Sequence, residues 1–202
     1  MGRRSDHTRE ELYEMALRAA RAIAHGSGLK GLTIRGIANQ IGYTHGTLYN
    51  LFDDLDDLIL HLNGQTLDAL YESLAVVPIA GDAESDLLAL ASSYFEFTRG
   101  NANLWNLLFE HHLPGYQPLP DWHHEKIAQL LGLVDRCLEP LFGPDRDAEK
   151  RHAARVIWTS LHGMASLETQ RKLIPGDTIE SMARSLVENY LGGLQASFRK
   201  SA

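Results

Sequence analysis

Apolar residues recur every three or four positions along most of the chain, which is the spacing of one buried face on an α-helix. In the first such stretch, residues 8–25, Thr8 can cap the start, and Gly26 and Gly28 can end the helix. The same spacing predicts helices over residues 33–42, 44–51, 53–77, 82–100, 101–112, 121–141, 148–173 and 178–198. No convincing run of alternating β-branched residues appears, so the predicted fold class is all-α.

The segment Leu32–Leu58 has the pattern of two short helices around a tight turn. Ala38 is small where the two helices would touch, and Ile37 and Ile41 share one face because they are four residues apart. Gly42 stands at the turn, where a positive φ requires no side chain. This pattern is typical of a helix-turn-helix, in which the first helix braces against the DNA backbone while the second lies in the major groove.

Removing the apolar positions from the second helix leaves a polar, uncharged face, which consists of Thr44, His45, Gly46, Thr47, Tyr49 and Asn50. Threonine can contact a thymine methyl group or a phosphate, and asparagine can bond adenine through two hydrogen bonds. Gly46 would let the helix approach DNA closely, and Thr44 is a natural N-cap. Two alternatives remain open on the residues alone: Tyr49 as a core aromatic, and His45 as an ordinary surface histidine.

Basic and acidic side chains are unevenly distributed along the chain. The net charge of the 202 residues is −7, which argues against a nucleic-acid partner because phosphate binding needs basic surface. Residues 1–52, however, hold seven basic and four acidic side chains, a net charge of +3, whereas residues 53–202 carry −10. Arg35 can reach a base or the backbone, and Arg3 and Arg4 look like a basic arm. The uneven charge predicts a basic DNA-binding domain over residues 1–52 and an acidic domain over residues 53–202.

The segment LTIRGIANQIGYTHGTLYNLF, set between a first helix and a long following helix, resembles the TetR family of transcriptional repressors. The resemblance covers residues 8–62 and implies an all-α chain with a three-helix DNA-binding domain and a larger ligand-binding and dimerisation domain. It places seven residues at operator-contacting positions, namely Thr33, Arg35, Thr44, His45, Thr47, Tyr49 and Asn50. One position departs from the family pattern: Leu55 stands where a phosphate-contacting lysine is common, inside the acidic run 53–57. Those carboxylates would weaken DNA binding, yet they would cap the next helix well.

The segment that runs from Ile157 to Gly163 resembles the Trp-x-x-x-His-Gly signature of one class of TetR C-terminal domain. Trp158 and His162 are four residues apart and share one helix face; the alternative is that they are only a core packing pair. The resemblance also implies a homodimer through the last two helices. The predicted interface residues are Leu161, Ala165, Leu186, Tyr190 and Leu194.

An effector would bind among the middle helices of such a protein. The candidate pocket residues are mostly aromatic, which suits a small apolar or aromatic ligand: Tyr71, Tyr94, Trp105, Phe109, His112, Trp158 and His162. The alternative is that most of them belong to the core. Binding would release a palindromic operator by favouring a different conformation of the dimer.

Two rival functions and the expected location follow from other residues. The ten histidines include the pairs 111–112 and 123–124, so the alternative function is a metal-responsive regulator; however, neighbouring residues on a helix point in different directions. No phosphate loop, nucleophile elbow or HExxH motif appears, so neither an enzyme nor a cofactor is predicted. A single cysteine, no apolar stretch of about 18 residues and no signal-like start favour a cytoplasmic protein without a membrane partner.

Overall fold

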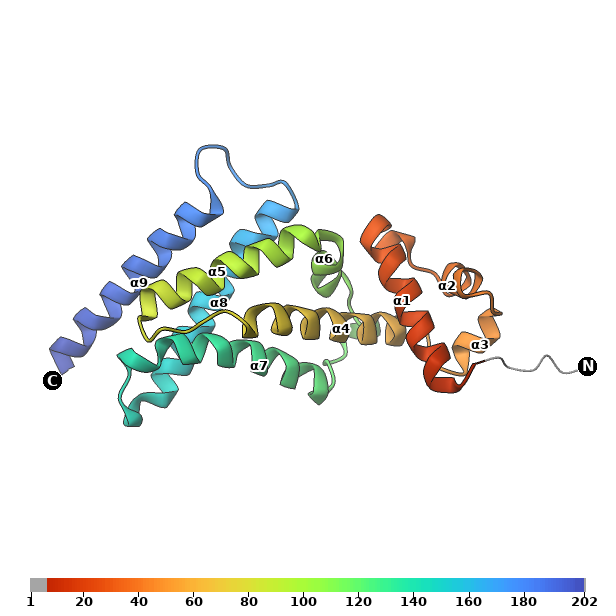
Figure 1. The fold of residues 1–202 in the computed structure, drawn as a ribbon, viewed down its shortest axis with the longest axis horizontal. Helices are drawn as coiled ribbons and strands as arrows, with labels where there is room; N and C mark the ends of the chain where they lie inside the picture. Colours follow the sequence, from red (N-terminus) through yellow and green to blue (C-terminus); the bar gives the residue numbers. More distant parts are fainter. Residues whose placement is uncertain (1–6, 202) are drawn as a thin grey trace, which may run out of the picture. The chain divides into compact units, whose positions relative to one another are not determined.

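The computed structural model describes residues 7–201, and every regular element in this range is helical, which confirms the predicted all-α fold class. The α-helices are α1 (Arg9–Ser27), α2 (Ile34–Ile41), α3 (His45–Tyr49), α4 (Leu55–Ala75), α5 (Ala83–Gly100), α6 (Ala102–Glu110), α7 (Asp121–Leu138), α8 (Asp147–Thr169) and α9 (Ile179–Ser201) (Figure 1). Short 3₁₀ turns occupy Leu29–Gly31, Pro114–Tyr116, Glu139–Leu141 and Pro144–Arg146. Arg3 and Arg4, the predicted basic arm, lie outside the described residues.

The chain packs into two compact units. Of the described residues, the first contains 7–67 and 101–120, and the second contains 68–100 and 121–201. Helix α4 contributes its first part to one unit and residues 68–75 to the other. These packing units do not divide the chain at Phe52, and the functional boundary at that residue stays a prediction.

In the first unit, α1 packs against α2 and α6, and α2 packs against α3. Its buried core joins α1, the helix-turn-helix and the start of α4, and it also takes Leu104 and Leu107 from α6. The Nδ2 group of Asn103 donates to the carbonyl of His25, 2.7 Å away, which ties α6 to the end of α1. Helix α6 is therefore an integral part of the unit that carries the predicted DNA-reading helix.

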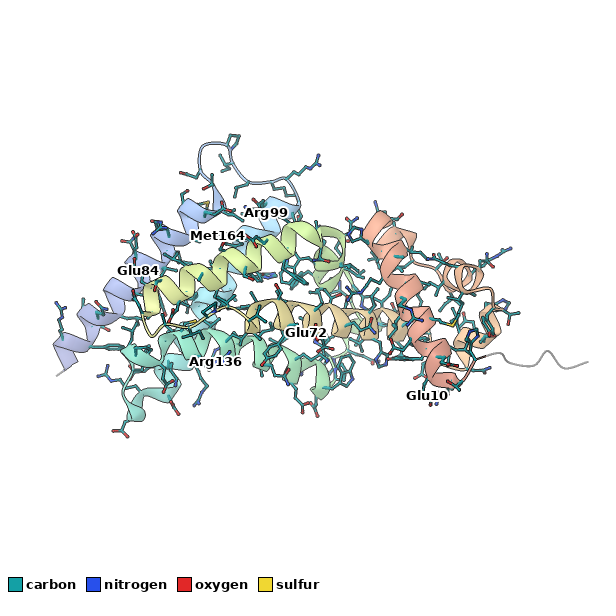
Figure 2. The ribbon with its side chains drawn as sticks, in the orientation of Figure 1. Glu10, Glu72, Glu84, Arg99, Arg136 and Met164 are labelled. Atoms are coloured by element: carbon teal, nitrogen blue, oxygen red, sulfur yellow. The ribbon has the colours of Figure 1, made fainter. Side chains whose placement is uncertain are left out.

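In the second unit, α5 packs against α7, α8 and α9, and α8 packs against both α7 and α9. A polar contact crosses three of these helices at the end of α5, where Figure 2 labels Arg99. Its guanidinium donates two hydrogen bonds to Glu168 of α8, at 2.9 and 2.8 Å, and a third to Glu180 of α9 at 2.6 Å. These bonds hold the pKa of Glu180 below its usual range. The two C-terminal helices are thus tied to α5 as well as to each other.

Several predicted helix ends were wrong by a few residues, each for a local reason. The α7 helix ends at Leu138 rather than 141, because Pro140 lies in a 3₁₀ turn. Helix α8 ends at Thr169 rather than 173, because Arg171 turns into the left-handed region at φ 56°. In α1 the helix continues through Gly26 and ends before Gly28, which has a φ of 62°.

Two kinds of feature are absent from the described residues. No helix within residues 7–201 is both long enough and apolar enough to cross a membrane. Within the same range, no three or more histidine, cysteine, aspartate or glutamate side chains gather in a way that could hold a metal ion.

Candidate nucleic-acid interface and aromatic cluster

The face of α3 that was predicted to read DNA is exposed. Leu48 is fully buried in the core of the first unit, whereas the Tyr49 side chain beside it is 54% exposed. The exposure of Tyr49 disfavours the core alternative. Thr47 is half-buried, and the other predicted contacts on this face are exposed: Thr44, His45, Gly46 and Asn50.

The turn that precedes α3 has the predicted geometry. Gly42 caps α2 in the left-handed conformation, with φ 77° and ψ 22°, so a side chain here would be strained. Its neighbour Tyr43 donates its backbone N–H to the carbonyl of Ala38 at 3.0 Å, as in a helix-terminating turn. The helix axis therefore changes direction at the position that the sequence predicted.

Helix α2 begins with a side-chain cap that positions Arg35. The Thr33 hydroxyl accepts a hydrogen bond from the Gly36 N–H at 3.0 Å, and a Cβ on Gly36 would lie only 2.9 Å from that hydroxyl. Thr33 and Arg35 are both exposed. The cap orients the first turn, so Arg35 projects from a fixed backbone into solvent.

The predicted capping role of Thr44 was partly wrong. Thr44 occupies the N-cap position of α3, but its side chain makes no hydrogen bond to the backbone there. Its hydroxyl instead lies 3.2 Å from the hydroxyl of Thr47. The first turn of α3 is held instead by a backbone hydrogen bond, which the Thr47 N–H donates to the Thr44 carbonyl at 3.0 Å. Both hydroxyls are therefore held as a pair on the outward face.

Sequence reasoning missed two contacts that hold this face from outside the motif. The Arg9 guanidinium, at the start of α1, donates to the carbonyl of Asn50 at 3.3 Å, just beyond the end of α3. His7 Nδ1 and the hydroxyl of Tyr43 are 2.7 Å apart. No local pattern signals either contact, because each joins residues more than thirty positions apart.

The acidic run before α4 is largely engaged in local bonds. The Asp54 carboxylate accepts from the Asp57 N–H at 2.8 Å, and Asp57 accepts from the Asp53 N–H at 3.1 Å. The predicted capping role is therefore confirmed. Asp57 also lies 3.4 Å from His61, and Asp56 lies 2.9 Å from Nε2 of His111. Leu55 is half-buried and packs on the core of the first unit.

The predicted effector residues fall into two groups, one in each unit. In the second unit, the buried Tyr94 joins two of them: its hydroxyl lies 3.1 Å from Nδ1 of His162, and its ring centroid lies 5.2 Å from that of Trp158. Nε2 of His162 lies 3.3 Å from the Ser166 hydroxyl. Burial raises the pKa of Tyr94 and lowers that of His162, so both groups are neutral at pH 7. Tyr71, the fourth residue of this group, is half-buried.

In the first unit, Trp105 is buried and its ring packs edge-on to that of Phe109, with the centroids 5.1 Å apart. Phe109 is 48% exposed. His112 is exposed, and its Nδ1–H donates to the carbonyl of Glu110 at 3.1 Å. These three candidates therefore belong to the same unit as the DNA-reading helix, whereas the Tyr94 group does not.

The predicted dimer residues divide into buried and surface positions. Leu161 and Ala165 are buried within the protomer, whereas Leu186, Tyr190 and Leu194 on α9 keep part of their surface exposed. Leu167 on α8 is 44% exposed. Gly163, Gly192 and Gly193 are exposed, and apart from the adjoining backbone of its own helix, a Cβ on any of them would meet no described atom within 4 Å. Among residues 7–201, no helix therefore packs closely against these glycines.

Comparison with known proteins identifies the architecture. Residues 16–62 match the family described as bacterial regulatory proteins, tetR family, and residues 87–190 match a tetracyclin repressor-like C-terminal domain. The uncharacterized HTH-type transcriptional regulator Rv0681 of Mycobacterium tuberculosis is 28% identical over 163 residues, which cover 80% of this chain and 70% of that protein.

Two solved structures show the same fold. A TetR-family transcriptional regulator from Streptomyces coelicolor superimposes with a TM-score of 0.70 at 18% identity, covering 98% of this chain and 85% of that one. The multidrug binding protein EbrR complexed with ethidium superimposes with a TM-score of 0.64 at 23% identity, covering 92% and 99%. Regulators of this type bind DNA and are not enzymes. From its matched domains and its helix-turn-helix geometry, the chain belongs to the TetR family of transcriptional regulators.

Proposed function

We propose that this protein is a homodimeric, effector-responsive repressor that binds a palindromic operator through α3. The observation that carries the proposal is the exposure of Tyr49 beside the fully buried Leu48. Tyr49 thus presents an aromatic ring and a hydroxyl group to solvent from a helix held by core contacts, and tyrosine side chains in such positions can contact the DNA backbone. The exposed Thr44 and Asn50 and the half-buried Thr47 supply hydrogen-bonding groups that suit base edges and phosphates.

The proposed dimer forms through the outward faces of α8 and α9. The part-exposed Leu186, Tyr190 and Leu194 supply apolar surface, and Gly163, Gly192 and Gly193 would let a second protomer approach closely. Two copies of the helix-turn-helix would then meet successive major grooves, roughly 34 to 36 Å apart along the DNA. Together the two copies carry twice the modest +3 charge of residues 1–52.

The proposed effector is a small apolar or aromatic molecule that contacts the cluster of Tyr94, Trp158 and His162. This cluster offers aromatic rings together with a neutral, hydrogen-bonded imidazole, a combination typical of ligand sites in which few polar groups set orientation. The structural relative EbrR is a multidrug binding protein in complex with ethidium, an aromatic cation, which supports the same ligand class. A metal-responsive regulator, the alternative function, would need several acidic or histidine side chains gathered around one point. Residues 7–201 contain no such group.

The test of DNA binding is a band-shift titration with genomic fragments from upstream of the gene and its neighbours. The Tyr49→Ala variant should bind about tenfold or more weakly than wild type, the loss expected from one or more base or phosphate contacts. Val76→Ala is the matched control, because Val76 is a 79% exposed apolar side chain on the second unit. Equal affinities for wild type and a folded Tyr49→Ala would contradict the proposal.

The test of effector binding has two steps. A thermal-shift screen of small aromatic compounds against wild type and Trp158→Leu identifies ligands whose stabilisation depends on this cluster. Hits are then added to the protein–DNA complex, leaving out intercalating dyes because they bind DNA directly. Compounds that stabilise the protein without releasing DNA would contradict the repressor mechanism.

A further inference from the structure

Arg9, the first residue of α1, reaches the end of the predicted DNA-reading helix. Its Nη2 group donates to the carbonyl oxygen of Asn50 at 3.3 Å, and Asn50 is the C-cap residue of α3. In the turn that follows, the backbone N–H groups of Leu51 and Phe52 both donate to Leu48. Carbonyl groups at the end of a helix lack partners within it, and a cation there also faces the negative end of the helix dipole. Arg9 therefore supplies the end of α3 with a donor and a positive charge from a different helix.

The start of α1 also contacts the chain just before α3. Nδ1 of His7 lies 2.7 Å from the hydroxyl of Tyr43, and the two rings pack edge-on with their centroids 5.9 Å apart. Between the two contacts, Thr8 is held by a capping box. Its hydroxyl accepts from the Glu11 N–H at 3.2 Å, and its own N–H donates to the Glu11 carboxylate at 2.7 Å. Residues 7–9 are therefore fixed at the start of α1 and contact the chain on both sides of α3.

Helix α3 depends on such contacts for its orientation. It has five residues, too few for a helix that is stable on its own. Leu48 is its buried residue, so the core holds this helix mainly at one point. Side chains that bind a ligand must be held by supporting residues to within about 0.5 Å of the productive geometry. A bond at the C-cap restrains the segment from which Tyr49 and Asn50 project.

Helix α1 makes two contacts with the segment that follows α3, and they differ in burial. Tyr13 lies one turn after Arg9 on the same face, and its ring stacks on that of the buried Phe52, with the centroids 5.0 Å apart. Arg9 and Asn50 are both exposed. A single exposed hydrogen bond contributes little to the stability of a fold, because water competes for both groups. Loss of the Arg9 bond should therefore appear in DNA binding rather than in folding.

Resting on the proposed operator binding, we propose that Arg9 is a positioning residue for DNA recognition: its bond to the Asn50 carbonyl holds the end of α3 in the orientation in which Tyr49 and Asn50 meet the operator. The bond lowers the ordering cost that α3 would otherwise pay on binding. Because it acts on the alignment of base-reading side chains, it favours the operator over other DNA. A direct contact of Arg9 with a phosphate would instead favour all DNA sequences alike.

The test compares Arg9→Met with wild type and Arg18→Met in the full-length protein by fluorescence anisotropy. The probes are the upstream fragment that wild type binds and a duplex of the same length with shuffled sequence, each titrated between about 50 and 200 mM salt. Arg18→Met is the matched control, because Arg18 is an exposed arginine of the same helix and the change removes the same charge. Arg9→Met should lose about tenfold in affinity for the upstream fragment. For the shuffled duplex it should lose no more than Arg18→Met loses, with the same salt slope.

Three further measurements separate positioning from charge and from folding. Arg9→Lys keeps a cationic donor, so it should recover most of the lost operator affinity. In an Asn50→Ala background, Arg9→Met should cost about threefold rather than tenfold, because one of the side chains that it positions is gone. Urea denaturation should give Arg9→Met the same stability as Arg18→Met.

Several results would overturn the inference while leaving the proposed operator binding intact. One is an Arg9→Met variant that binds both DNAs like Arg18→Met, or that costs the same tenfold in the Asn50→Ala background. Another is equal weakening on both DNAs with a salt slope less negative by about 0.9 per subunit, which would make Arg9 a direct phosphate contact. A variant less stable than Arg18→Met would assign Arg9 a structural role only. If wild type prefers no upstream fragment over the shuffled duplex, the proposed function fails, and this inference fails with it.

Discussion

The hydroxyl of Tyr94 and Nδ1 of His162 lie 3.1 Å apart and join α5 to α8 inside the second unit. Tyr94 is 2% exposed, and burial disfavours the charged forms of both groups. The pair is therefore a neutral hydrogen bond in an apolar setting, where the loss of one partner costs more than it would at the surface.

Tyr94→Phe should destabilise the protein by about 1 to 3 kcal/mol, because the imidazole would keep its burial and lose the hydroxyl partner. Urea denaturation of the variant and wild type measures this difference. Tyr71→Phe is the matched control, since Tyr71 is half-buried and no hydrogen bond of its hydroxyl is described. A Tyr94→Phe variant as stable as wild type would show that the contact contributes no net stability.

The free energy of unfolding should fall as the pH drops below about 6.5, the ordinary histidine value. Burial lowers the pKa of His162, and burial with the nearby charges of His124 and Lys126 lowers that of His123. In this pH range the two histidines therefore bind more protons in the unfolded chain than in the folded one, so the free energy of unfolding decreases as the pH falls. Urea denaturation between pH 5 and 8 measures the slope, and His123→Gln with His162→Gln should flatten it. A slope unchanged in this double variant would assign the pH dependence to other groups.

The helix-turn-helix could be predicted because its constraints are local. Each constraint can be recognised in a short stretch of sequence. These constraints are the positive φ at Gly42, the small Ala38 between two helices and the exposed polar face of α3. The contacts Arg9–Asn50 and His111–Asp56 join residues 41 and 55 positions apart. They depend on how α1 and α6 pack, which hydrophobic periodicity does not encode.

The same difference between local patterns and distant contacts explains why the dimer and pocket residues were only partly predicted. Periodicity placed Leu161, Ala165, Leu186, Tyr190 and Leu194 on apolar stripes, but a stripe does not say which partner covers it. The structure shows that α8 directs Leu161 and Ala165 into the protomer, whereas the α9 residues keep exposed surface. Likewise, composition grouped seven aromatic and histidine residues as one pocket, and the chain distributes them over two packing units.

Leu55→Lys should tighten non-specific DNA binding and steepen its salt dependence, because it adds about one phosphate contact per subunit. The structure adds a cost, since Leu55 packs on the core of the first unit and the lysine must leave its charged end in solvent. Binding titrations from 50 to 200 mM salt measure the slope of log affinity against log salt, which should become more negative by about 0.9 per subunit. Leu55→Gln is the control, because it removes the same apolar packing and adds no charge. A Leu55→Lys slope equal to that of Leu55→Gln would place the start of α4 away from the DNA backbone.

Two glycines of the reading motif should respond to alanine in opposite ways. Gly42 has a φ of 77°, so Gly42→Ala should destabilise the protein by about 1 to 2 kcal/mol through backbone strain. Gly46 lies inside α3 with an ordinary φ, and a Cβ there would come no closer than 3.8 Å to the Thr44 hydroxyl. Gly46→Ala should therefore keep or raise stability by up to about 1 kcal/mol, since alanine favours the helix.

The effect of Gly46→Ala on DNA binding separates the two reasons for a glycine at this position. If the start of α3 approaches the DNA backbone closely, the added methyl group should weaken operator binding about tenfold, a cost comparable to one lost contact. Urea denaturation and band-shift titration of the same preparation measure both quantities. Gly42→Ala serves as the contrast, because its loss of affinity should follow its loss of folded protein. A stable Gly46→Ala variant that binds the operator like wild type would exclude close approach at this residue and would leave Tyr49 and Thr47 as the main contacts of the helix.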